Sequence, residues 1–99
     1  MDTAVRRGSR NVFRDLGFPP QEAAHLQLRA ELMVRLRKLI RDRGLTQAAA
    51  AALFGVSQPR VSDLVRGKID RFSIDTLVTM LGHAGKRVSM VFRRKAKVA

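Results

Sequence analysis

The stretch GVSQPRVSDLVRGK, residues 55–68, carries the side chains whose types and spacing are most informative about chemistry. A helix over this stretch would turn Val61 and Leu64 toward the interior. Its outer surface would then present a row of hydrogen-bonding side chains, namely Gln58, Arg60, Ser62 and Asp63. Glutamine can form two hydrogen bonds to adenine, and arginine can do the same to guanine. The row therefore predicts a surface that reads base edges in the major groove of DNA.

The residues before this stretch supply the element that must position it. The run TQAAAAALF, residues 46–54, predicts a helix that starts at a threonine N-cap and ends at Gly55. Glycine at that point accepts the positive φ of a tight turn without a Cβ clash. Ala51 is small where the two helices would cross closely, and Val56 would face inward. Two helices joined by about three residues are the arrangement of a helix-turn-helix.

Further residues around this motif are expected to contact the phosphate backbone. The first helix of the motif begins at Gln47, and its free N–H groups can meet a phosphate. Pro59 lies in the first turn of the second helix, where its missing N–H removes no helical bond. Phosphate contacts set position and affinity but carry no sequence information. The predicted DNA-binding set is Thr46, Gln47, Ser57, Gln58, Pro59, Arg60, Ser62, Asp63, Arg66 and Lys68.

One more helix is predicted on each side of the motif. Leucines at helical spacing indicate a helix from Pro20 to about Arg43, which Gly44 would end. Ser73 is the expected N-cap of a last helix that ends near Gly82. The fold class is therefore mainly all-α, with four to five helices around the helix-turn-helix.

Beyond the helices the period of the sequence changes. Val88, Met90 and Phe92 alternate with other residues, which predicts a β-strand over residues 86–93. A lone strand is not stable in water, so it needs a partner strand. That partner could be its own copy in a homodimer, the NVF segment at residues 11–13, or another protein.

Composition limits the function classes. The 99 residues suffice for one small domain, and the net charge of +12 with a pI near 11.8 favours an acidic partner such as nucleic acid. The chain has no cysteine and no apolar run long enough for a membrane span, which predicts a cytoplasmic protein. His25 and His83 lack neighbours at metal-ligand or catalytic spacing. We therefore expect no enzyme, no metal and no cofactor.

The two ends of the chain are read as separate segments. Residues 1–18 lack helical or strand periodicity and predict a flexible arm. Its apolar cluster would either order onto a partner protein or fold back onto the first long helix. The cluster consists of Val12, Phe13, Leu16 and Phe18. Residues 94–99 form a basic tail that either remains solvated or flanks bound DNA.

Taken together, the segments GLTQ, FGVSQPRVSDLVRGK and FSIDTL resemble the XRE family of helix-turn-helix domains, the Cro/C1 type of phage repressors. More narrowly, GSRNVFRDLGF and the strand after LGHAGKRV make the chain similar to HigA-type antitoxins. The resemblance runs from Gly8 to Phe92 and places the DNA-binding domain at residues 19–85. Pro59 departs from phage repressors, which often have a base-contacting polar residue there, so the operator sequence stays open.

This resemblance implies a homodimer that binds a palindromic operator, with Gln47 at a phosphate and both Gln58 and Asp63 at base-facing positions. The dimer interface would include the strand residues Val88, Met90 and Phe92. It also implies an RNA-cleaving toxin partner of the RelE/HigB kind, with the arm as the contact. The alternative is a stand-alone repressor without a toxin. RNA binding through the basic tail is disfavoured because the chain has no Trp or Tyr for base stacking.

Overall fold

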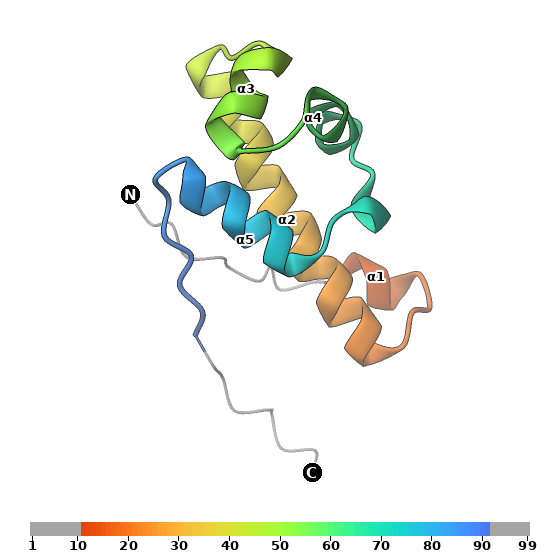
Figure 1. The fold of residues 1–99 in the computed structure, drawn as a ribbon. Helices are drawn as coiled ribbons and strands as arrows, with labels where there is room; N and C mark the ends of the chain where they lie inside the picture. The colour runs from red at the N-terminus through yellow and green to blue at the C-terminus, as the bar shows by residue number, and fades with distance from the viewer. Residues whose placement is uncertain (1–10, 92–99) are drawn as a thin grey trace.

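The computed structural model describes residues 11–91, and this part of the chain is almost entirely helical (Figure 1). Its elements in chain order are α1 (Val12–Asp15), α2 (Pro20–Arg43), α3 (Gln47–Phe54), α4 (Gln58–Val65), the 3-10 turn η1 (Ile69–Arg71) and α5 (Ile74–His83). The long helix α2 lies at the centre of the fold. α1 lies against the first turns of α2, and α3 lies at its other end. The predicted mainly α-helical fold class is confirmed.

One hydrophobic core joins α2, α3, α4 and α5. The leucine spacing of α2 turns Leu32, Met33 and Leu36 inward, where each is buried. Phe54 from α3 and Phe72 before α5 are the two largest buried side chains. Burying a large apolar side chain stabilises a fold by about 1.5–3 kcal/mol. The orientation of α3 and α4 is therefore fixed by the same core that holds α2 and α5 together.

Hydrogen bonds confirm the predicted starts of α3, α4 and α5. At each of these three N-caps a hydroxyl oxygen accepts a bond from a backbone N–H three residues later. The donor–acceptor pairs are Ala49 to Thr46 at 3.0 Å, Arg60 to Ser57 at 3.3 Å and Thr76 to Ser73 at 3.1 Å. At the other ends, Gly44 and Gly55 have φ of 58° and 70°, the left-handed conformation expected of them.

The last helix ends near Gly82, as predicted, but Gly82 is not the glycine of the turn. α5 continues past Gly82 to His83, and the glycine with positive φ is Gly85 at 80°. The N–H of Gly85 donates to the Gly82 carbonyl, and that of Lys86 donates to the Leu81 carbonyl. Gly82 is not among the glycines with positive φ, and α5 ends one residue after it.

The expectation of an unstructured arm is wrong for its last residues. Val12 to Asp15 form the short helix α1, whose N-cap Asn11 accepts bonds from the N–H groups of Phe13 and Arg14. The Asn11 Nδ2 donates to the carbonyl of Ala23 at 3.1 Å, which ties this helix to α2. The remainder of the predicted arm, residues 1–10, lies outside the described residues.

The predicted C-terminal strand is not formed in the part of the chain that the structure describes. Residues 86–91 run without regular secondary structure, and Phe92 and the basic tail lie outside the described range. The physical reason is that this segment has no second strand beside it to complete a ladder. Between residues 11 and 91 no helix has both the length and the apolar composition to cross a membrane.

A short segment between α4 and α5 is held by arginine side chains from two helices. The Nη1 of Arg29, on α2, lies 3.4 Å from the carbonyl oxygens of both Ile69 and Phe72. The Nη1 of Arg60, on α4, donates to the carbonyl of Arg71 at 2.8 Å. These contacts fix the η1 segment against both α2 and α4.

Candidate nucleic-acid interface

α3 and α4 form a helix-turn-helix whose connection is Gly55, Val56 and Ser57 (Figure 1). The N–H groups of Gly55 and Val56 both donate to the carbonyl of Ala51, the latter at 3.0 Å. Ala51 is itself buried, as the close crossing of the two helices requires. The predicted turn and its small residue are therefore both present.

The inner face of α4 anchors the helix to the core. Val61 and Leu64 are completely buried, and Val56 packs against the same cluster from the turn. α4 has only eight residues, which is too short to be stable alone in water. The burial of these apolar residues is therefore what holds the outer face of α4 in a fixed orientation.

The outer face begins at the N-terminus of α4. Ser57, Gln58 and Pro59 are exposed there, and Arg66 is exposed just after the helix. Ser62 and Asp63 are half-buried. The side chain of Gln58 forms no hydrogen bond to any described residue, so its amide is free to bond a base edge. The polar row predicted from the sequence thus has its most accessible part at the end of α4 that can reach into a groove.

Arg60 does not point outward as its position in the row suggested. Its guanidinium carbon lies 5.5 Å from the centroid of the Phe72 ring, and its Nη1 donates to the Arg71 carbonyl at 2.8 Å. A guanidinium over an aromatic face is attracted by the quadrupole of the ring. Arg60 therefore links α4 to the residues that precede α5.

Asp63 has a similar linking role. Its carboxylate lies 3.7 Å from the Lys68 Nζ and 3.7 Å from the Arg71 Nη1. Lys68 was predicted as a phosphate contact, whereas Arg71 was not part of the predicted site. No local pattern connects Arg71 to α4, because the contact depends on how η1 folds back. One carboxylate thus gathers two cations at the C-terminal side of α4.

The N-terminus of α3, the other helix of the motif, is also exposed. Thr46 and Gln47 are exposed, and the Thr46 hydroxyl is used by the N–H of Ala49. The N–H groups of Gln47 and Ala48 have no partner among residues 11–91. Free N–H groups at a helix start favour an anion such as a phosphate.

Comparison with known proteins agrees with this geometry. A family model described as a helix-turn-helix domain matches residues 12–93. A solved structure whose name assigns it to the XRE family of transcriptional regulators is 35% identical. The match covers 79% of this chain and 90% of that one, with a TM-score of 0.71. The chain belongs to the XRE family of helix-turn-helix proteins. A search of curated proteins gives no match.

This XRE-family chain has a second exposed surface on α1, separate from the helix-turn-helix. Val12 is 53% exposed and Leu16 is 70% exposed, although α1 is docked on α2. Phe13 and Phe18 form an edge-to-face pair with ring centroids 6.0 Å apart. Neither of the two sequence-based alternatives describes this fully, because the segment is folded back while its apolar side chains remain largely exposed.

The two histidines of this XRE-family chain lie apart from each other. His25 is exposed on α2, and His83 is the last residue of α5. The His83 ring lies beside Gly55, where a Cβ on the glycine would be 3.3 Å from it. Among the described residues, no group of three or more His, Asp or Glu side chains gathers as a metal site would require.

Proposed function

We propose that the protein is a sequence-specific DNA-binding transcriptional regulator in which α4 enters the major groove. The observation that carries this proposal is the two-sided character of α4. Val61 and Leu64 lock it to the core, while Gln58 at its N-terminal end is exposed and unbonded among the described residues. A solved relative named as a transcriptional regulator supports the same reading.

Gln58 is the principal base-reading residue in this proposal, since glutamine can form two hydrogen bonds to adenine. Ser62, one turn further along α4, lies on the same side and would contact a neighbouring base. Arg60 would have to leave Phe72 and the Arg71 carbonyl to reach guanine. Its role is therefore to hold the orientation of α4.

Phosphate contacts would come from both ends of the motif. The free N–H groups of Gln47 and Ala48 at the start of α3 suit one phosphate. Arg66 and Lys68 after α4 suit another, with Lys68 held near Asp63. Such contacts supply affinity that falls as salt rises, without any base preference.

The experiment is selection of duplexes from a random library by the wild-type protein, followed by affinity measurements on the selected duplex and its single-base-pair variants. Gln58→Ala should lose about 1–3 kcal/mol of discrimination at one base pair. Gln21→Ala is the matched control, because Gln21 is an exposed glutamine on the first turn of α2. Arg66→Gln should weaken binding to all duplexes by a similar factor.

Two outcomes would count against the proposal. Recovery of no common sequence from the library would argue against specific recognition. If Gln58→Ala and Gln21→Ala changed the discrimination between base pairs equally, the residues that contact the bases would not be those of α4.

We further propose that the protein acts as a homodimer on a palindromic operator, with the two α4 helices about 34 Å apart. The segment after α5 supports this, because Met90 and Val91 are exposed while Val88 packs against the core. Pairing with its own copy would give this segment the partner strand it lacks. Met90→Asp should lower the dimer affinity in sedimentation, whereas Met90→Leu should not, and a wild-type monomer at tens of micromolar would contradict the proposal.

The finer role that we propose is that of an antitoxin that also binds a toxin. It is supported by the exposed apolar side chains of Val12 on α1 and of Leu16 at its C-cap, the more exposed of the two. The test is co-expression with any small reading frame beside the gene. Growth arrest relieved by this protein, and lost again with Leu16→Asp, would support an antitoxin. No arrest and no complex would favour the stand-alone repressor.

A further inference from the structure

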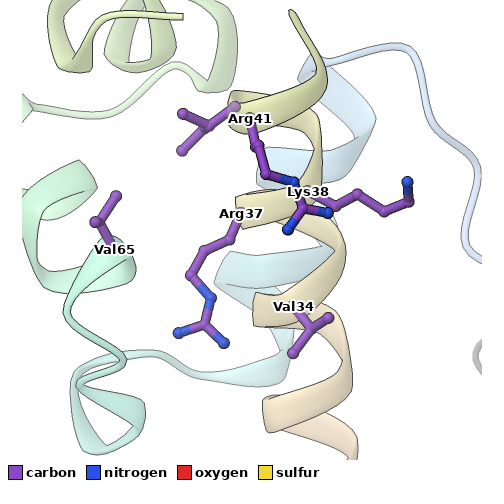
Figure 2. A pocket seen from close by; sticks show the side chains of 6 residues that line it. Val34, Arg37, Lys38, Arg41 and Val65 are labelled. Atoms are coloured by element: carbon purple, nitrogen blue, oxygen red, sulfur yellow. The ribbon is translucent and has the colours of Figure 1, made fainter. Parts of the chain in front are cut away.

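We propose that the basic edge of α2 binds the sugar–phosphate backbone of the same DNA whose groove α4 enters, an inference that rests on the proposed function. The binding region is a hollow between the C-terminal half of α2 and the end of α4 (Figure 2). Its volume is about 420 Å³, and it is lined by Val34, Arg37, Lys38, Ile40, Arg41 and Val65. None of these residues belongs to the predicted DNA-binding set.

The hollow lies on the same side of α4 as Gln58 and Ser62, the proposed base-contacting residues. Val65 follows Gln58 by seven residues and Ser62 by three, a spacing that places all three along one side of a helix. Val65 is exposed, and Figure 2 shows it facing the α2 side chains across the hollow. A DNA strand that borders the groove occupied by Gln58 and Ser62 would therefore run past Val65 and reach α2.

The charges of the hollow suit a phosphate. Lys38 is already engaged, because its Nζ lies 2.8 Å from a carboxylate oxygen of Asp42. The Nε of Arg41 lies 3.7 Å from the other carboxylate oxygen of Asp42, and the Arg41 side chain is mostly exposed. Arg37 forms no hydrogen bond or ion pair with any residue in the described part of the chain. Arg37 is therefore the cation with the most binding capacity left, and Arg41 is the second.

The guanidinium of Arg37 lies beside Gly67, just after α4. Its Nη1 would lie 3.2 Å from a Cβ placed on Gly67, so the guanidinium covers the turn that ends α4. The C-terminal end of a helix attracts a cation, which helps to hold the guanidinium there. A guanidinium can donate several bonds at once and matches the geometry of a phosphate. Val34, Ile40 and Val65, which line the same hollow, offer an apolar surface for a deoxyribose.

The continuity with α4 favours DNA over an acidic peptide as the occupant. A peptide could also combine an aliphatic side chain with carboxylates, but it would have no reason to align with Gln58 and Ser62. A DNA strand is aligned with these residues by the recognition of the groove itself. Removing the charges of Arg37 and Arg41 on α2 should therefore change the salt dependence of DNA binding and leave the base preference unchanged.

The test measures the affinity of Arg37→Gln and of the double variant Arg37→Gln/Arg41→Gln for the duplex selected by the wild type, over a range of salt concentrations. Each lost phosphate contact should reduce the slope of log K against log salt by about 0.9. Arg37→Lys keeps the charge and should keep the slope. Arg14→Gln is the control, because Arg14 is an exposed arginine on α1, at the other end of α2.

An unchanged slope in the double variant would overturn the inference, and so would a shift in its base preference. A second measurement does not depend on variants that must fold. Neutral methylphosphonates placed one at a time along the duplex should weaken wild-type binding at a backbone position beyond the bases read by α4. The absence of any such position would also overturn it. Failure of the wild type to select a sequence would instead contradict the proposed function.

Discussion

The guanidinium of Arg60 lies over the ring of Phe72, with 5.5 Å between its carbon and the ring centroid. Phe72 is buried in the core, whereas Arg60 belongs to the helix that faces outward. The same guanidinium donates to the carbonyl of the neighbouring Arg71 at 2.8 Å. The position of α4 thus depends on a residue beyond its own C-terminus as well as on its apolar face.

We expect Arg60 and Phe72 to be energetically coupled. A double-mutant cycle with Arg60→Met and Phe72→Leu should give a coupling energy of about 0.5–1 kcal/mol in the free energy of unfolding. Methionine keeps the apolar stem of arginine, so the cycle isolates the contact between the charge and the ring. The measurement is chemical denaturation of the four proteins, and purely additive effects would show that the contact contributes nothing.

Gly55→Ala should destabilise the protein more than Gly44→Ala. Both glycines have positive φ, of 70° and 58°, and a left-handed alanine costs roughly 1–2 kcal/mol at either position. Only at Gly55 would the new Cβ also crowd a neighbour, the His83 ring at 3.3 Å. Around Gly44 there is no atom within 4 Å of that position.

The excess cost at Gly55 can be assigned to His83 by a second substitution. Adding His83→Ala to Gly55→Ala should remove the difference between the two glycine variants in thermal unfolding. If the two variants lose equal stability from the start, the ring moves aside without cost and the expected crowding does not occur.

Ser73→Ala should lower the free energy of unfolding by about 1 kcal/mol, because it removes the N-cap of α5. For a domain of this size that corresponds to a fall of roughly 4–8 °C in the melting temperature. Ser73→Asp is the matched control, since its carboxylate can accept the same bond from the Thr76 N–H. An equal loss in both variants would mean that the cap bond is not the source of the effect.

The pKa of Asp42 is lowered from its ordinary value of 3.8, mainly by the hydrogen bond from Lys38. A lowered carboxyl pKa stabilises the folded state above pH 3.8, and this contribution is lost as the pH falls through the lower folded value. Lys38→Met should raise the pKa of Asp42 toward 3.8 in an NMR titration. Lys68→Met, which leaves this pair intact, should not change it.

The parts of the fold that were predicted correctly are those fixed by local contacts. Thr46, Ser57 and Ser73 each bond a backbone N–H only three residues away, so the sequence pattern contains the whole interaction. Gly44 and Gly55 end their helices for an equally local reason, the positive φ of the turn. The end of α2 and the starts of α3, α4 and α5 followed from these signals.

The features that were missed depend on residues far apart in the sequence. α1 has four residues and would not persist alone, but the Asn11 side chain secures it to the Ala23 carbonyl. The inward turn of Arg60 requires Phe72 and Arg71, which arrive only when η1 has folded back. No periodicity in α4 distinguishes an arginine that reads a base from one that packs on a ring.

The short segment that follows α4 is held through its backbone carbonyls. Ile69, Arg71 and Phe72 offer these oxygens to Arg29 and Arg60, and any residue type supplies the same oxygen. Asp70, exposed between them, can therefore change during evolution without disturbing α4. Related proteins could diverge at this position while retaining the same helix placement, so the identities of Arg29 and Arg60 are constrained more tightly than that of Asp70.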